Sequence, residues 1–252
     1  MSAPAPARLI TIPISHYCEK ARWALDRAGI AYREERHVQI VHRIASRRAG
    51  GRGTVPVLVA ADGVFAQSAA IDAYADRHTD PGARLYPEDR ERRAEVVALE
   101  RDFDTRLGPE GRRWMYVHIL PERDLGRAYN CAGVPAWERH AFPLLLGVMS
   151  RYLRHLFALG PETPAQAGAV VQETFDAVAA RLADGRPYLC GGSFTAADLA
   201  FAALAAAVIV PPEYGVALPQ PDELPPDMAT AVRAFRAHPA GAFALRLFRD
   251  ER

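Results

Sequence analysis

Residues 9–25 read LITIPISHYCEKARWAL, and this stretch decides the fold. It begins with apolar and β-branched residues, which predict a strand that ends at Pro13. Ser15 is a residue type favoured at helix N-caps, and from His16 the apolar residues follow helical spacing as far as the stop signal Gly29. The stretch therefore predicts a buried strand that leads into a helix, with Ser15 at the junction. Because a helix N-terminus stabilises an anion, a hydroxyl there can hold a phosphate, a carboxylate or a thiolate.

The composition narrows the classes of function. The 252 residues are enough for two domains at ~150 residues per domain. A formal net charge of +1 gives no bulk electrostatic reason to expect a nucleic-acid or membrane partner. The few cysteines have no paired spacing, which indicates a reducing compartment, and the start MSAPAPARL lacks the apolar core of a signal peptide. We therefore expect a cytoplasmic protein, and we expect no metal site.

Outward from the opening stretch, strand and helix patterns alternate as far as residue 77. The turn Asp62-Gly63 is typical of a tight hairpin. The expected elements are a polar strand at 30–38, a weak basic helix at 39–48, a strong strand at 54–60, its hairpin partner at 64–66 and a helix at 69–77. The order β-α-β-α-β-β-α combines a parallel pair with a hairpin, so it predicts a mixed four-stranded sheet.

Beyond residue 87 the pattern is helical. We expect helices at 88–107, 112–120, 137–159, 162–183, 196–210 and 228–236. Gly108-Pro109 is expected to break the first of these, the segment 121–135 to be irregular, and the proline-rich segment 211–226 to cross the surface. Thr195 and Asp198 have the spacing of a capping box, with Asp in place of the usual Glu, and give a structural cap to a helix that is apolar on nearly all sides.

Three short motifs in the N-terminal part carry a resemblance to a known family. They are Ser15-His16-Tyr17-Cys18 at the first strand–helix junction, Thr54-Val55-Pro56 before a strand, and Gln67-Ser68-x-x-Ile71 at the start of a helix. In this order the chain resembles the cytosolic glutathione S-transferases of the serine-type, bacterial-like classes, and the Thr195–Asp198 cap is similar to the folding motif of their C-terminal domain. The resemblance implies a thioredoxin-like α/β domain at 1–80 that binds glutathione, a linker at 81–88 and an all-α domain at 89–252.

The resemblance also implies roles for individual residues. Ser15 would be the catalytic residue that stabilises the glutathione thiolate, and Val55, which precedes a cis Pro56, would pair with the glutathione backbone. Gln67 and Ser68 would hold the γ-glutamyl end. By analogy with the same classes, His42 and Arg52, which flank the glutathione region, are candidates for contact with the glycyl carboxylate. Trp114, Tyr116 and His118 are candidates for the pocket of the second substrate.

Each of these roles has a plainer alternative. Ser15 could be a helix cap without catalytic effect. His42 and Arg52 could belong to a solvated basic loop, and the three aromatic residues between 114 and 118 could be packing between helices. Cys18 occupies the second position of a C-x-x-C motif whose first position is Ser15, so we interpret it as a core residue and not as a redox centre. We expect Tyr17 to pack and His16 to face the surface.

The resemblance predicts a homodimer that conjugates the glutathione thiolate to a small electrophile, with a role in detoxification and glutathione as the co-substrate. A glutathione-dependent isomerase, lyase or peroxidase would share the same thiolate site. A non-catalytic glutathione-binding or scaffold protein is the alternative of a different class. The sequence does not define the second pocket that distinguishes these functions.

Overall fold

A four-stranded mixed sheet forms the core of the N-terminal domain in the computed structural model, which describes residues 6–252. The strands are β1 (Ala7–Thr11), β2 (Tyr32–Arg36), β3 (Val57–Ala60) and β4 (Gly63–Ala66), in the spatial order β2-β1-β3-β4. β1 is parallel to β2 and antiparallel to β3, and β3 forms a hairpin with β4. The mixed sheet and its hairpin therefore confirm the prediction, although β3 begins later than residue 54.

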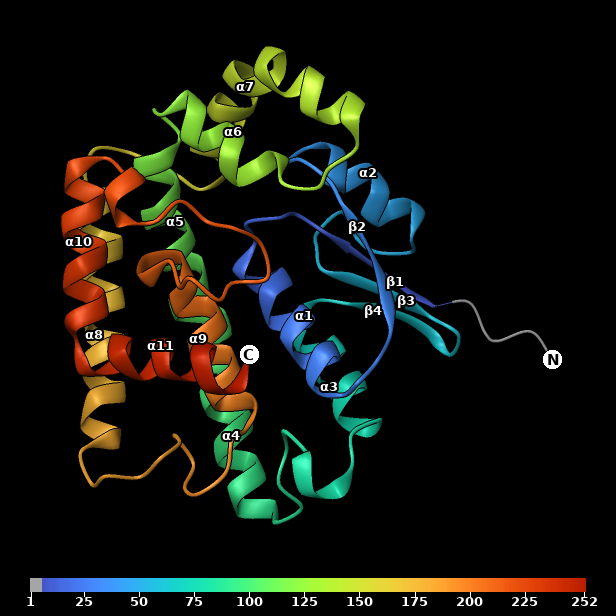
Figure 1. Cartoon of the computed structure of the whole chain (residues 1–252), viewed down its shortest axis with the longest axis vertical. Helices are drawn as coiled ribbons and strands as arrows, with labels where there is room; N and C mark the ends of the chain where they lie inside the picture. Colours follow the sequence, from blue (N-terminus) through green and yellow to red (C-terminus); the bar gives the residue numbers. More distant parts are fainter. Residues whose placement is uncertain (1–5) are drawn as a thin grey trace.

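Three helices complete this thioredoxin-like domain: α1 (His16–Arg27), α2 (Val41–Arg48) and α3 (Ser68–Arg77). α1 and α3 pack against each other and lie between the sheet and the helical domain (Figure 1). α1 also packs against α9 (Ala196–Ile209), so the helix that begins at Ser15 is covered on two sides. Its N-terminus is thereby fixed at the boundary between the domains.

The C-terminal domain is built around α9, every residue of which is buried. That burial agrees with a helix that is apolar on all sides. The Asp198 carboxylate accepts hydrogen bonds from the Thr195 N–H at 2.9 Å, the Thr195 hydroxyl at 2.8 Å and the Leu189 N–H at 2.7 Å, and so caps the helix. The surrounding helices are α4 (Arg90–Asp102), α5 (Gly108–Ile119), α6 (Arg123–Cys131), α7 (Ala136–Leu156), α8 (Thr163–Leu182), α10 (Pro226–Ala237) and α11 (Pro239–Glu251).

The break predicted at Gly108-Pro109 is wrong. The chain stays helical from α4 to α5 through a π-helical turn at Phe103–Leu107, in which the Gly108 N–H bonds to the Phe103 carbonyl. Pro109 lies in the first turn of α5, and its missing N–H can be accommodated there because the π turn has already shifted the hydrogen-bond register.

Two further helices were not predicted. α6 lies in the segment expected to be irregular, and its buried Gly126 faces Leu146 of α7. Packing of α6 on α7 therefore supports a helix that includes a residue of low helix propensity. α11 follows α10 at Pro239, which starts the new helix, and the His238 side chain accepts a bond from the Ala240 N–H. No helix within residues 6–252 is long and apolar enough to cross a membrane.

Candidate functional site

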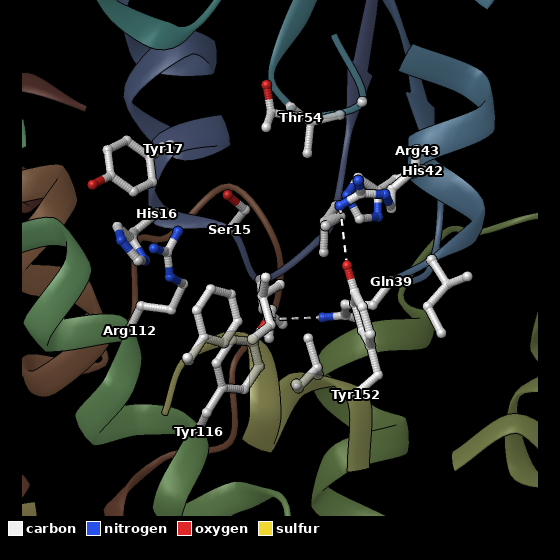
Figure 2. A pocket seen from close by; sticks show the side chains of 18 of the residues that line it. Ser15, His16, Tyr17, Gln39, His42, Arg43, Thr54, Arg112, Tyr116 and Tyr152 are labelled. Carbon is white, nitrogen blue, oxygen red and sulfur yellow. Dashed lines mark hydrogen bonds between the residues drawn. The ribbon is translucent and has the colours of Figure 1, made fainter. Parts of the chain in front are cut away.

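Ser15 lies at the N-cap of α1, between the end of β1 and the helical domain. Its Oγ accepts a hydrogen bond from the Cys18 N–H at 3.4 Å, and the side chain is half-buried. Figure 2 shows the hydroxyl in the middle of a cavity that is bounded by both domains. The hydroxyl is therefore both a cap and a group that a ligand can reach.

The cavity around Ser15 has a volume of about 310 Å³, a size suited to a small organic molecule. Its walls are mostly apolar and aromatic. They include Met115 and Tyr116 of α5, Leu153 and Leu156 of α7, and Phe157 immediately after α7. Such walls favour an apolar or aromatic body in the bound molecule.

A second cavity of about 360 Å³ adjoins the first and brings the three N-terminal motifs together. Val55 lines both cavities, whereas Pro56, Gln67 and Ser68 line only the second. The Val55–Pro56 peptide is cis. The Gln67 N–H bonds to the Pro56 carbonyl at 3.1 Å, which joins two of the motifs directly.

The N-terminus of α3, which lies at this cavity, can bind an anion. Gln67 has a positive φ of 79° and its side chain makes no capping bond, so the exposed amide stays available to a ligand. Ser68, the first residue of α3, is buried. The free N–H groups of the first turn favour a negative charge at this position.

Three of the basic residues between 42 and 52 concern the site: two line the main cavity, and the third is exposed. His42 and Arg43 line the main cavity, whereas Arg52 is exposed and outside the lining of both cavities. Burial lowers the pKa of His42 to about 4, so this imidazole is neutral at pH 7. Arg43, which the sequence analysis missed, donates to the Tyr152 hydroxyl at 3.1 Å and is the charged group at this end.

Of the aromatic residues expected in the second pocket, the structure brings one to the cavity. Tyr116 lines it, accepts a hydrogen bond from Gln39 Nε2 at 3.2 Å and stacks on Phe157. The rings of Trp114 and His118 contact each other in a tilted arrangement, with 4.4 Å between their centroids, and neither residue lines the cavity. Residues four apart share a helix face and residues two apart do not.

The same helical spacing identifies residues that the sequence analysis missed. Positions 112, 115 and 116 lie on one face of α5, and Arg112, Met115 and Tyr116 all line the cavity. Once Tyr116 is taken as a lining residue, the spacing i−4 finds Arg112, and the spacing i+3 from Arg112 finds Met115. Arg112 brings a positive charge close to Ser15 (Figure 2).

The prediction that His16 faces the surface is wrong. His16 is buried and its Nε2–H donates to the Gly108 carbonyl at 3.0 Å. Burial, with a smaller contribution from the Arg112 charge, lowers the pKa of His16 to about 3, so the imidazole stays neutral. It therefore joins the start of α1 to the start of α5 as a hydrogen-bond donor and not as an ion.

Tyr17 lines both cavities and also joins the two domains. Its hydroxyl donates to the Asp104 carbonyl at 2.7 Å, a carbonyl in the π turn that precedes Pro109. Gly108 makes room for this contact, because a Cβ there would come 2.3 Å from the Tyr17 hydroxyl oxygen. The absence of a side chain at Gly108 therefore lets the tyrosine pack against the start of α5.

Cys18 is fully buried and unpaired. Burial raises the pKa of its thiol to about 11, so almost none of it is thiolate at neutral pH. Since thiolate is the reactive form, the geometry favours the interpretation of Cys18 as a core residue.

The segment between α9 and α10 reaches back to the site. Tyr214 is buried, and its hydroxyl donates to the Ile14 carbonyl at 3.1 Å, one residue before Ser15. The Gly215 N–H bonds to Glu19 Oε1 of α1 at 3.1 Å. This proline-rich segment therefore supports the strand–helix junction from the helical domain.

A buried ion cluster holds α1, α3 and the α4–α5 run together. Lys20, the single lysine of the chain, lies 3.2 Å from Asp72, 3.0 Å from Glu100 and 2.8 Å from Asp104. Burial alone would lower the pKa of Lys20, but the three carboxylates raise it. The Tyr86 hydroxyl donates to Glu100 at 2.9 Å. Within residues 6–252 no group of His, Cys, Asp and Glu is arranged to hold a metal ion.

Known structures share this architecture at low sequence identity. A glutathione S-transferase of Ceriporiopsis subvermispora in complex with glutathione is 19% identical, with a TM-score of 0.61 and 98% of each chain covered. One from Methylobacillus flagellatus KT with glutathione bound is 17% identical, with a TM-score of 0.59, and 97% of this chain and 98% of that chain are covered. FzlA from C. crescentus is 18% identical, with a TM-score of 0.57 and coverage of 98% and 99%. At such identities the likeness shows the fold alone.

Family models identify both domains. The model of the glutathione S-transferase N-terminal domain matches residues 9–82, and the model of the C-terminal domain matches residues 134–237. No curated protein sequence matches the chain. The two family matches cover both the sheet domain and most of the helical domain, and they show that this chain belongs to the glutathione S-transferase superfamily.

Proposed function

We propose that this protein is a glutathione transferase that joins the glutathione sulfur to a small electrophile, with Ser15 as the hydrogen-bond donor to the thiolate. The observation that carries the proposal is the position of Ser15. It caps α1 inside a cavity of suitable size, and the adjoining cavity contains Val55, Gln67 and Ser68. A tripeptide thiol bound along the second cavity would bring its sulfur to the Ser15 hydroxyl.

The magnitude of one hydrogen bond is sufficient for this role. A free thiol has a pKa near ~8.5, so only ~3% is ionised at pH 7. A hydrogen bond to a charged partner contributes about 1.5–3 kcal/mol, which corresponds to a decrease of roughly one to two units in the thiol pKa. With the partial charge of the helix N-terminus in addition, bound glutathione would be largely thiolate at neutral pH.

The other glutathione groups would meet the residues around this position. The Val55 backbone would pair with the peptide, and Gln67 and Ser68 would hold the γ-glutamyl carboxylate at the start of α3. For the glycyl carboxylate we propose Arg43 in place of Arg52, because Arg43 lines the cavity and carries a charge, with neutral His42 as a neighbouring polar group. The homodimer, the cytoplasmic location and the detoxification role stay predictions.

Thiolate absorbance near 240 nm, followed against pH for bound glutathione, tests the proposal in the wild type, Ser15→Ala and Ser15→Thr. We expect the bound thiol to ionise below its free pKa in the wild type and in Ser15→Thr, which keeps a hydroxyl, and near the free value in Ser15→Ala. Urea unfolding of each variant separates this effect from the loss of the cap, which costs about 1 kcal/mol.

Two results would contradict the assignment. If glutathione binds with an unshifted pKa in the wild type, Ser15 is a cap and the chain is a glutathione-binding protein without transferase chemistry. If glutathione does not bind, the similarity to the family is one of fold.

A further inference from the structure

Arg112 places an uncompensated positive charge in the cavity. It extends from α5 toward Ser15 and His16 (Figure 2) and lines both cavities. No ion pair within the described residues 6–252 includes Arg112, and its buried Nε has no hydrogen-bond partner. A cation that has lost part of its hydration, without a counter-ion in the protein, is explained if a bound molecule supplies the negative charge.

Aromatic rings fix the guanidinium in this position. Its central carbon lies 4.4 Å from the ring centroid of Phe157 and 5.8 Å from that of Tyr17. Cation–π contacts of this kind use the flat face of the group, so the N–H groups at its edge stay available. A planar carboxylate can accept two of these N–H bonds at once.

The surroundings of Arg112 favour an anion. Among the described residues that line the main cavity, none is acidic. The one carboxylate that lines the adjoining cavity belongs to Asp104, and it is already bonded to Lys20 at 2.8 Å. The Arg112 charge also shifts the pKa values of its neighbours. Burial lowers the pKa of His16 and Arg112 lowers it further, and burial raises the pKa of Tyr17 while Arg112 opposes that change.

The two cations of the cavity lie on opposite sides of Ser15. Arg43 and His42 are together on the α2 side in Figure 2, and Arg112 is on the α5 side, beside Tyr17 and Tyr116. If Arg43 receives the glycyl carboxylate of glutathione, as proposed above, Arg112 is left to the second substrate. The apolar wall at Met115, Tyr116 and Phe157 belongs to the same side.

We propose that Arg112 selects electrophiles that carry a carboxylate or a similar anionic group on an aromatic or apolar body. This inference rests on the proposed transferase function for the chemistry, although the binding preference itself does not need turnover. Arg112 would bind the anionic group, and Phe157 and Tyr116 would contact the body. A model reaction is the attack of the thiolate on an aromatic carbon that bears chlorine, in which the C–S bond forms and chloride leaves with the electrons of the C–Cl bond.

Binding of an unreactive matched pair tests the preference. Titration calorimetry would compare 3,5-dinitrobenzoate with 3,5-dinitrobenzamide on the glutathione-saturated protein. We expect the benzoate to bind roughly 10- to 100-fold more tightly, as one charge-assisted contact provides. Arg112→Met should abolish the preference by weakening only the benzoate, and Arg112→Lys should keep part of it.

Arg106→Gln is the matched control, because Arg106 is exposed in the turn before α5 and pairs with Glu173. It removes the same charge and should keep the preference. Circular dichroism and thermal unfolding would show that each variant is folded. Turnover would be measured separately with 4-chloro-3,5-dinitrobenzoate and its amide, so that a failure of conjugation counts against the proposed function alone.

Three outcomes would overturn the inference. The wild type could bind the benzoate and the amide equally. Arg106→Gln could lose the preference as Arg112→Met does, which would point to net charge and not to position. Arg112→Met could weaken glutathione binding and leave the ratio unchanged, which would assign Arg112 to glutathione itself.

Discussion

Replacing Lys20 with methionine should destabilise the protein strongly. Methionine has a similar length, but it leaves Asp72, Glu100 and Asp104 without their buried cation, which now lies 2.8–3.2 Å from each. The loss of one partner of a buried ion pair typically costs about 3–5 kcal/mol. For a chain of this size such a loss corresponds to a decrease of roughly 6–20 °C in the unfolding temperature. Urea and thermal unfolding, followed by tryptophan fluorescence, would measure it.

The pH dependence of this loss identifies its cause. Without Lys20 the buried carboxyls should have pKa values above those in the unfolded chain, ~3.9–4.3. A carboxyl whose pKa is higher in the folded state than in the unfolded chain stabilises the folded state at pH values below its unfolded pKa. This stabilisation is lost as the pH rises through the pKa of the folded state. The free energy of unfolding that Lys20→Met loses relative to the wild type should therefore be smaller at pH 5 than at pH 8.

The double variant Lys20→Met/Asp72→Asn should regain part of the stability. Burial, only partly offset by Lys20, raises the pKa of Asp72, so a neutral amide suits this position better than an unpaired charge. A deficit under 1 kcal/mol (well below the expected ~3–5), or one that is equal at the two pH values, would refute an electrostatic role for the cluster.

Three further predictions concern the cap, the buried thiol and the buried imidazole. Asp198→Ala removes the acceptor of bonds from Leu189 and Thr195 and should lower the free energy of unfolding, measured in urea, by about 2–4 kcal/mol. A free energy of unfolding for Asp198→Ala that is not lower than that of Asp198→Asn would speak against this role. Cys18, whose pKa burial raises to about 11, should escape iodoacetamide at pH 8 in the native protein and react in urea, and mass spectrometry that finds native alkylation would reverse this. Burial lowers the pKa of His16 from 6.5 to about 3, so the unfolded chain takes up the proton first as the pH falls. The free energy of unfolding should therefore decrease between these values by up to ~1.4 kcal/mol per pH unit, and His16→Gln should reduce this slope if the reasoning holds.

The features that the sequence predicted correctly depend on residues close together in the chain. A run of apolar and β-branched residues predicted β1, the strong strand pattern at 54–60 predicted β3, and Asp62-Gly63 predicted the hairpin between β3 and β4. Local chemistry also placed Ser15 at the start of α1 and paired Thr195 with Asp198. Turn, cap and strand signals act within a few residues, so they need no knowledge of the rest of the molecule.

Local signals failed where a distant contact decides the structure. The sequence of α1 favours an exposed His16, but the side chain is buried and bonds to the Gly108 carbonyl of α5. Gly108 and Pro109 were expected to end a helix, yet the π turn and the Tyr17 hydroxyl satisfy the backbone groups that they disturb. α11 was not predicted for a similar reason, since packing on α8 and α9 supports it.

The sequence by itself determined the strand–helix junction at Ser15 and the family of the fold. Only the tertiary structure decided which residues complete the cavity. Arg43 reaches it and Arg52 does not, and on α5 the face of Arg112 and Tyr116 points to it instead of that of Trp114. The direction of a side chain along a helix follows from spacing, but which face meets the other domain is set by packing over the whole chain. For that reason the place of Ser15 could be predicted from local residues, whereas the positive charge that Arg112 brings to the cavity became evident only when the two domains were seen together.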